Sequence, residues 1–315
     1  MLALRNSLFL LIFLVPLVAS AEVTQASLPE GTLWYLHANL KQMRESESGQ
    51  HLHKWLDGQI FMEIHEDIGI DINSETDAVT AFSDREQGTV ILVEGNISKD
   101  TQDKLLAIAA AKGRFAMLEH KDKIFYHVQS SKSSGEHEDE QGPDHEDDLL
   151  DGLEHNAYFS FAAKNRLIVT SDENQMQAML DNGGKITGSR SHEGALFVLT
   201  ADRTFVQAGL RTDRLADDDD GWRSNIIRNT EQAALLISGR DNLLAVQAQL
   251  VSSDAKMAES IGGIANGLIS LQAFNSDLDP RIRTLIQNTK IEVTDNVLSV
   301  NTVIEPGLVT TMLSD

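Results

Sequence analysis

Two segments of the chain, residues 79–98 and 234–253, carry the same pattern of apolar and polar residues without a gap. The first reads VTAFSDREQGTVILVEGNIS and the second reads ALLISGRDNLLAVQAQLVSS. In each, two short apolar runs rich in β-formers flank a polar turn, and serine follows (Ser98 or Ser253). This arrangement is typical of a β-hairpin. The repeat predicts that one structural unit occurs twice, which restricts the folds open to the chain.

Each hairpin is followed by a predicted helix and then by two more predicted strands. Ser98 is a plausible cap for the first helix and Gly113 closes it, while Ser253 leads into the second. The later strands surround Lys121-Asp122-Lys123 in one copy and Asp295-Asn296 in the other.

The match extends upstream of the hairpins. Residues 32–41 (TLWYLHANLK) and 204–213 (TFVQAGLRTD) both resemble a strand ending in a polar turn. Residues 40–68 then show apolar residues at helical spacing, and the second copy has room only for a short helix there.

The resulting order is strand, helix, strand, strand, helix, strand, with one strand appended, which is the order of a ferredoxin-like split βαβ fold. The predicted fold is α+β, with two duplicated ferredoxin-like (βαββαβ-type) units that have antiparallel sheets. A hairpin–helix segment intervenes, with a hairpin from AYFSFAA and RLIVTS and a helix from Asp172 to about Asp181. The predicted boundaries are 1–21 signal peptide, 22–130 first unit, 131–155 acidic loop, 156–203 hairpin–helix connector and 204–315 second unit.

The first residues predict export. Arg5 precedes an apolar run from Leu8 to Val18, and Ala19-Ser20-Ala21 fits the small-x-small pattern of signal peptidase. An uncleaved anchor is the alternative, but the run is short for a span of roughly 20 residues and contains Pro16. We therefore expect a periplasmic or extracellular protein, with no membrane span after cleavage.

Charge and cysteine content narrow the partners. The formal net charge is −22, which repels nucleic acid and anionic lipid and favours cations or basic partners. The chain has no cysteine, so neither disulfides nor thiol catalysis is available. A chain of this length buries a large core without such cross-links.

No motif in the sequence names a reaction. Four His-Glu pairs occur, but none has the second histidine of a zinc-protease helix. Ser253 and Lys256 fit a Ser-x-x-Lys pattern whose Lys-Thr-Gly companion is missing. Gly263 and Gly267 form a GxxxG pattern, for which we expect close packing on a sheet. Paired carboxylates for hydrolysis stay open, since acids are abundant.

The segment 136–155, EHEDEQGPDHEDDLLDGLEH, holds ten acids and three histidines. Histidine and carboxylate are metal-ligand types. The candidate metal ligands are His137, His145, His155, Asp144 and Glu146. A solvated connector between two strands fits the composition best, and specific metal ligation and weak cation adsorption are the alternatives. No cofactor is expected, apart from this candidate divalent cation.

These observations favour a non-catalytic binding or structural module that contacts an unknown protein or envelope component. A divalent-metal-binding protein and a hydrolase whose site is not readable from sequence are the alternatives. A pocket lined by polar groups from both predicted units would favour an enzyme. A broad exposed apolar face would favour the binding module.

Overall fold

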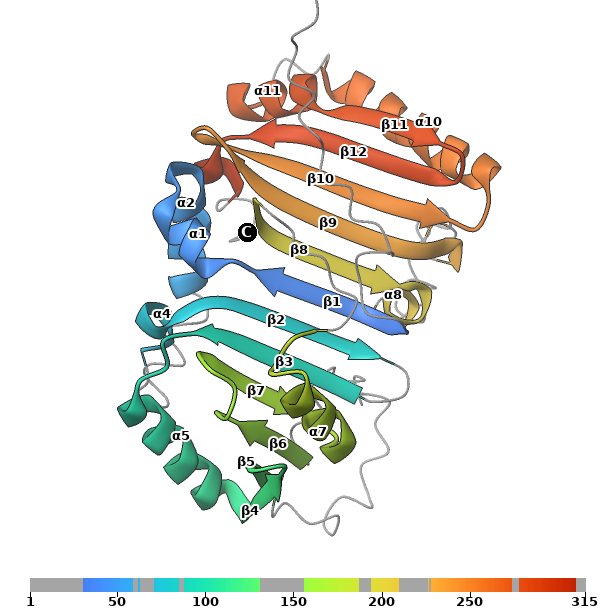
Figure 1. Cartoon of the computed structure of the whole chain (residues 1–315). Helices are drawn as coiled ribbons and strands as arrows, with labels where there is room; N and C mark the ends of the chain where they lie inside the picture. The colour runs from blue at the N-terminus through green and yellow to red at the C-terminus, as the bar shows by residue number, and fades with distance from the viewer. Residues whose placement is uncertain are drawn as a thin grey trace, which may run out of the picture.

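A computed structural model describes residues 31–58, 62, 71–84, 88–130, 156–186, 194–209, 226, 228–273 and 278–309. These residues form one twelve-stranded sheet in the order β11-β12-β10-β9-β8-β1-β2-β3-β7-β6-β5-β4. Figure 1 shows the sheet as one continuous strip from β11 to β4. The predicted signal peptide, residues 1–21, and the acidic loop, residues 131–155, lie outside the described residues.

Most strands follow one another in hairpins, and helices lie between these groups along the chain. The strands are β1 Thr32–Ala38, β2 Thr76–Asp84, β3 Gly88–Gly95, β4 Gly113–His120, β5 Lys123–Ser130, β6 Asn156–Ser160, β7 Arg166–Thr170, β8 Ala195–Asp202, β9 Thr230–Arg240, β10 Leu243–Ser252, β11 Lys290–Thr294 and β12 Val297–Ile304. The helices are α1 Leu40–Glu45, α2 Glu47–Leu56, α4 Ile72–Glu75, α5 Lys99–Lys112, α7 Glu173–Asp181, α8 Arg203–Gly209, α10 Ala255–Ala273 and α11 Pro280–Asn288.

The α+β class and the antiparallel sheet are confirmed, but the ferredoxin-like arrangement is not. A split βαβ fold needs parallel neighbours, whereas every pair of neighbouring strands in the described sheet is antiparallel. The reason lies in the connections, because α1, α2 and α4 return the chain to the strand directly beside β1.

The two halves of the sheet share an order. The second half runs β8-β9-β10-β12-β11, and the first runs β1-β2-β3, then β7-β6, then β5-β4. The halves differ by the β6–β7 hairpin, which separates β3 from β5. This hairpin and α7 lie where the sequence predicts a hairpin and a helix. Asp172 caps α7 by accepting a hydrogen bond from the amide of Gln175 at 3.0 Å. Duplication of the halves stays a prediction.

The prediction of a strand that begins at residue 204 is wrong, because α8 spans Arg203–Gly209. The Asp202 carboxylate accepts a hydrogen bond from the amide of Phe205 at 2.9 Å, which starts a helix. The strand of this region is β8, which falls inside the predicted 156–203 connector and pairs with both β1 and β9.

The hairpin match also needs a gap. Asp84 pairs with Gly88 across β2 and β3, so three residues separate the closing pair. Arg240 pairs with Leu243 across β9 and β10, which leaves two. When the first strands of the two hairpins are aligned, the ungapped sequence match therefore places β3 and β10 one residue out of register with each other.

Each face of the sheet carries its own core. One face packs against α7, and its buried residues include Tyr35, Val90, Phe125, Ile168, Met176, Leu180 and Val198. The other packs against α1, α2 and α11, and its residues include Ala38, Leu40, Met43, Leu52, Ile237, Leu244 and Ile304. Because side chains alternate along a strand, neighbouring residues such as Leu36 and His37 of β1 point to opposite faces. Helices thus cover part of each face, and α10 and α5 lie against the strands at the two ends of the sheet.

Candidate functional site

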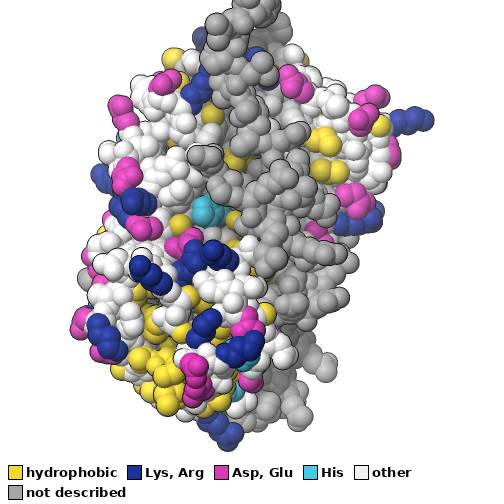
Figure 2. Space-filling model, in the orientation of Figure 1, with side chains coloured by type: hydrophobic (Ala, Val, Ile, Leu, Met, Phe, Trp, Pro, Cys, Tyr) yellow, Lys and Arg dark blue, Asp and Glu magenta, His cyan; other side chains and the backbone are white. Residues whose placement is uncertain are grey.

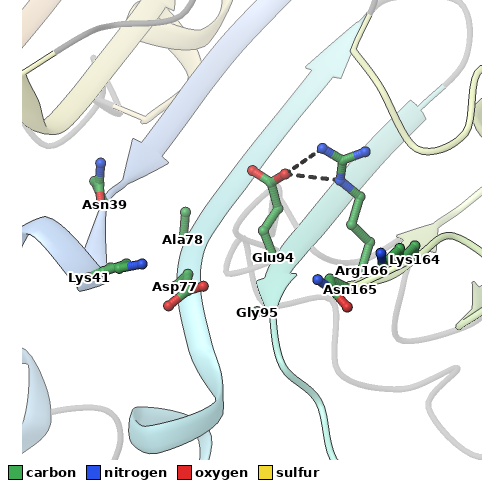
Figure 3. Close-up of a pocket in the computed structure, with 9 residues that line it drawn as sticks. All are labelled: Asn39, Lys41, Asp77, Ala78, Glu94, Gly95, Lys164, Asn165 and Arg166. Carbon is green, nitrogen blue, oxygen red and sulfur yellow. Dashed lines mark hydrogen bonds and ion pairs between the residues drawn. The ribbon is translucent and has the colours of Figure 1, made fainter.

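A polar pocket of about 530 Å³ lies where β1 ends, β2 begins and β3 ends (Figure 3). Its lining residues are Asn39, Lys41, Asp77, Ala78, Glu94, Gly95, Lys164, Asn165 and Arg166.

Local structure places these side chains. Asn39 caps α1, since its side chain accepts a hydrogen bond from the amide of Gln42 at 3.0 Å, and Lys41 follows in the first turn. Asn165 has a φ of 57°, a left-handed conformation that asparagine tolerates, in the turn between β6 and β7. Arg166 opens β7 directly opposite Glu94 of β3.

The two carboxylates of the pocket are both paired with arginine. Nε and Nη2 of Arg166 donate to Oε1 of Glu94 at 2.9 and 2.7 Å, and Nη1 donates to the carbonyl of Gly183 at 3.1 Å. Asp77 lies 3.5 Å from Arg44, whose Nη1 donates to the carbonyls of Asn73 and Thr76.

The negative charge of Glu94 also acts on Tyr35 of β1. Burial, with a further contribution from Glu94, raises the pKa of Tyr35 to about 12.

The pocket offers polar contacts rather than a recognisable catalytic group. Its nine lining residues include no serine, threonine, tyrosine, cysteine or histidine, and its carboxylates are held by arginines. Lys41 and Lys164 supply two ammonium groups to any anion that enters. All nine residues lie between positions 39 and 166, so none comes from the second predicted unit. This pocket therefore does not combine polar groups from both predicted units, the arrangement that would favour an enzyme.

Exposed large apolar side chains form two groups far from the pocket. Of the seven among the described residues, three lie on the β4–β5 hairpin and three on α10, with Met62 apart from both. The β4–β5 surface consists of Phe115, Met117 and Ile124, and the α10 surface consists of Ile264, Leu268 and Leu271. The groups flank opposite ends of the sheet (Figure 1). Hydrophobic side chains are concentrated at the end where α5 and β4 lie (Figure 2).

The β4–β5 surface is one face of a two-stranded ribbon. Phe115 pairs with Val128, Met117 with Tyr126 and Glu119 with Ile124, so the three exposed residues share a face. Tyr126 is stacked between Phe115, with ring centroids 5.5 Å apart, and Phe159 of β6, 5.2 Å apart. This row of stacked rings holds the side chains of the face in place. Met117, which is 66% exposed, lies on the same face on the terminal strand β4.

The α10 surface follows from helical spacing. Ile264, Leu268 and Leu271 recur every three or four residues and so lie on one face. The neighbouring face of the helix is buried on the sheet through Ala258, Ile261 and Gly262. A Cβ on Gly262 would lie 2.5 Å from Cγ2 of Val293, whereas one on Gly263 or Gly267 would meet nothing within 4 Å. The prediction that Gly263 and Gly267 pack on the sheet is therefore wrong, and the packing glycine is Gly262.

The predicted metal ligands His137, His145, His155, Asp144 and Glu146 all lie outside the described residues. Within the described part of the chain, no group of three or more histidines and acids is placed to hold a metal ion. The structure does fix the ends of this segment, because Gln129 of β5 lies opposite Asn156 of β6. The described helices include none long and apolar enough to cross a membrane.

The sequence alone predicted the strands and the helix that carry these surfaces, but neither surface. Apolar residues on a strand look the same in sequence whether their face is covered or open. The spacing of Ile264, Leu268 and Leu271 was the one available signal, since they form a stripe beside the buried one on α10. The pocket residues carry no motif.

No protein-family model and no curated protein matches this chain. Among solved structures, crystal form III of TP0453 is similar over 93% of this chain and 99% of that chain, with 13% identity and a TM-score of 0.48. Crystal form I aligns with 92% of this chain and 95% of that chain at 13% identity and a TM-score of 0.45. Crystal form IV aligns with 92% and 96% at 11% identity and a TM-score of 0.46. Likeness at this level identifies neither a ligand nor a partner.

Proposed function

We propose that this chain is an exported, acidic, non-catalytic interaction protein of the periplasm or extracellular space. It contacts a protein or another envelope component through the β4–β5 surface and the α10 surface. One observation carries the proposal: six of the seven exposed large apolar side chains among the described residues gather in these two groups.

The energetic argument concerns where apolar surface is left in water. Single exposed apolar residues are ordinary, whereas grouped ones mark surfaces that a partner covers. Burying a large aliphatic side chain contributes about 1.5–3 kcal/mol, and Met117 and Leu271 are 66% and 70% exposed. Three such side chains on each surface supply enough apolar contact for the centre of a small interface.

The rest of the chain supports binding rather than catalysis. The pocket between β1, β2 and β3 has its acids paired with arginines, and its lining residues include no serine, threonine, cysteine or histidine. The strong negative charge keeps the protein soluble despite its apolar surfaces. It also selects neutral or basic partners over nucleic acid and anionic lipid.

Site-specific photo-cross-linking in the producing cells tests this proposal. A photoreactive phenylalanine analogue replaces Met117 in one variant, Leu271 in a second and Asn174, which is exposed on α7, in a third. We expect discrete adducts at positions 117 and 271 and none at 174, with all three variants recovered in the exported fraction. Absence of adducts at both apolar positions, or the same adducts at position 174, would overturn the proposal.

A further inference from the structure

The sheet has two terminal strands, and they differ in protection. A helix lies beside each of them, α10 beside β11 and α5 beside β4. β11 has five residues, of which Lys290 and Glu292 are charged. β4 has eight residues, and its centre, Phe115-Ala116-Met117-Leu118, is an uncharged apolar run without proline. Proteins usually blunt an edge with short strands, charges or proline, because an open apolar edge pairs with another strand. β11 has two of these features, while the centre of β4 has none.

The hairpin turn determines which backbone groups of β4 are open. Lys121 and Asp122 form a two-residue turn with φ angles of 48° and 64°, closed by the pair His120 and Lys123. The closing pair of such a turn exchanges hydrogen bonds across the hairpin, and the pattern alternates along the strand. Gly113, Phe115, Met117 and Glu119 therefore direct their N–H and C=O groups away from β5. They form a row of donors and acceptors ready for another strand.

We propose that a second copy of this chain occupies this edge, with β4 pairing antiparallel to β4 around a two-fold axis at Ala116. This inference rests on the proposed function, since it names the partner of the β4–β5 surface. The axis stands perpendicular to the sheet, so the two sheets join with like faces continuous. Phe115 of each copy then lies opposite Met117 of the other.

The side chains select this register. It places an exposed aromatic ring against an exposed thioether, a favourable contact that extends the row of rings from Phe159 and Tyr126. Moving the two-fold axis to residue 117 also keeps like faces on the same side of the joined sheet. In that register Met117 lies opposite Met117 of the other copy, and Phe115 lies opposite Glu119. That arrangement leaves the ring beside a charge, so it covers less apolar surface.

Charge permits the contact at this edge. The chain carries −22 overall, so two copies repel one another at long range. The hairpin 113–130 is an exception, because Arg114, Lys121 and Lys123 outnumber Glu119 and Asp122 by three to two. The copies therefore meet at a part of the surface where acids do not face acids. Added salt screens the remaining repulsion and should strengthen the dimer.

The dimer is expected to be weak. One strand and its two rows of side chains form a smaller contact than the roughly 1,200 Å² at the lower limit of a standard interface. Association should therefore depend on concentration and reverse on dilution.

Sedimentation equilibrium of the purified full chain provides the first test. The wild type should show a monomer–dimer equilibrium that tightens between low and moderate salt. Met117→Lys should weaken dimerisation at least tenfold, because it places a charge at the centre of the edge. Leu268→Lys makes the same change on the α10 surface and should follow the wild type. Circular dichroism and thermal melts establish that both variants are folded.

Disulfide trapping provides the second test and reads the register. The chain has no cysteine, so a single introduced thiol gives an unambiguous cross-link. Ala116→Cys should form a covalent dimer on mild oxidation, because residue 116 faces itself across the axis. Ser270→Cys, exposed on α10, should stay monomeric. A wild type that is monomeric at every concentration, together with no trapping at position 116, would overturn the inference. The proposed function would still stand if position 117 or position 271 cross-links to another species in cells, and would fall with the inference if neither does.

Discussion

Leu36 of β1 lies directly opposite Leu199 of β8, and this pairing joins the two halves of the sheet. The strand that opens the first half and the strand that opens the second are thus hydrogen-bonded neighbours, although they are far apart in the sequence. The halves consequently share one sheet and two continuous faces. Stability measured at one end of the sheet should therefore report on residues along its length.

Tyr35, beside Leu36, predicts a loss of stability at alkaline pH. Burial, assisted by Glu94, raises the pKa of Tyr35 from 10.0 to about 12. The unfolded chain releases this proton near pH 10 and the folded chain does so only near 12. The folded state therefore loses stability as pH rises through this window, at on the order of 1 kcal/mol per pH unit. Urea unfolding of the wild type at pH 9, 10 and 11 should show the fall, and Tyr35→Phe should show a smaller one. Equal slopes in the two proteins would contradict this assignment.

Glu75 should hold the start of α5. Its carboxylate accepts hydrogen bonds from the amide of Ser98 at 2.9 Å and the hydroxyl of Thr101 at 3.0 Å. Burial raises the pKa of Glu75, but these hydrogen bonds outweigh it and lower the pKa overall from 4.5. Glu75→Gln should cost about 1–2 kcal/mol, since charged hydrogen bonds at a helix N-terminus are lost. The stability from Glu75 is present above its unfolded pKa and is lost as pH falls through the lower folded value.

Urea unfolding at pH 7 and pH 4 measures the Glu75 effect. Glu47→Gln is the matched control, because Glu47 lies in the first turn of α2 and is exposed. Its replacement should change the free energy of unfolding by less than about 0.5 kcal/mol. If both variants lose the same amount, the helix dipole rather than the hydrogen bonds of Glu75 explains the effect.

Adjacent glycines in α10 should respond in opposite directions. A Cβ on Gly262 would meet Val293 at 2.5 Å, so Gly262→Ala should destabilise the protein by about 1–3 kcal/mol through overpacking. Gly263 faces open space, and Gly263→Ala should stabilise it by about 0.5–1 kcal/mol because alanine favours helix. Thermal unfolding of both variants measures the difference. A destabilised Gly263→Ala would show that α10 packs through a different face.

The acidic tract should be replaceable. Its flanks are held together, since Gln129 and Asn156 are opposite one another on neighbouring strands. A five-residue turn of glycine, serine and asparagine in place of residues 131–155 should change the free energy of unfolding by less than about 1 kcal/mol, because loop closure depends weakly on length. Urea unfolding of the intact and shortened chains checks this expectation. A larger loss would mean that the tract packs on the folded protein.

Metal binding by the tract makes a separate prediction. If His137, His145, His155, Asp144 and Glu146 bind a divalent cation, that cation raises the melting temperature of the intact protein. The shortened protein should then show no rise. Melts with zinc, copper or calcium against chelator separate this alternative from a solvated connector, for which neither protein responds specifically. A rise in both proteins would place the cation elsewhere.

The sequence predicted elements well and their arrangement poorly, for physical reasons that particular residues show. Asp172 and Gly183 bound α7 through local capping chemistry, which is visible in any short window. Residues 204–206, Thr-Phe-Val, look like a strand, and the cap from Asp202 overrides their propensity. Strand order depends on which apolar faces meet, and that information is distributed over the chain. For the same reason the sequence does not predict that Met117 and Leu268 are exposed, because exposure depends on which other elements pack beside them.

The insertion of β6–β7 between β3 and β5 has a consequence for how the chain folds as it is made. β5 ends at residue 130, and its neighbour β6 begins only at residue 156, so the β4–β5 hairpin leaves the ribosome before it has anywhere to dock. The second neighbour of β1 is made later still, since β8 begins at residue 195. Strand pairs so distant in sequence form slowly and keep edges open in the meantime. The nascent chain should therefore depend on holding chaperones until β8 emerges, and truncation before that point should yield a product that proteases clear.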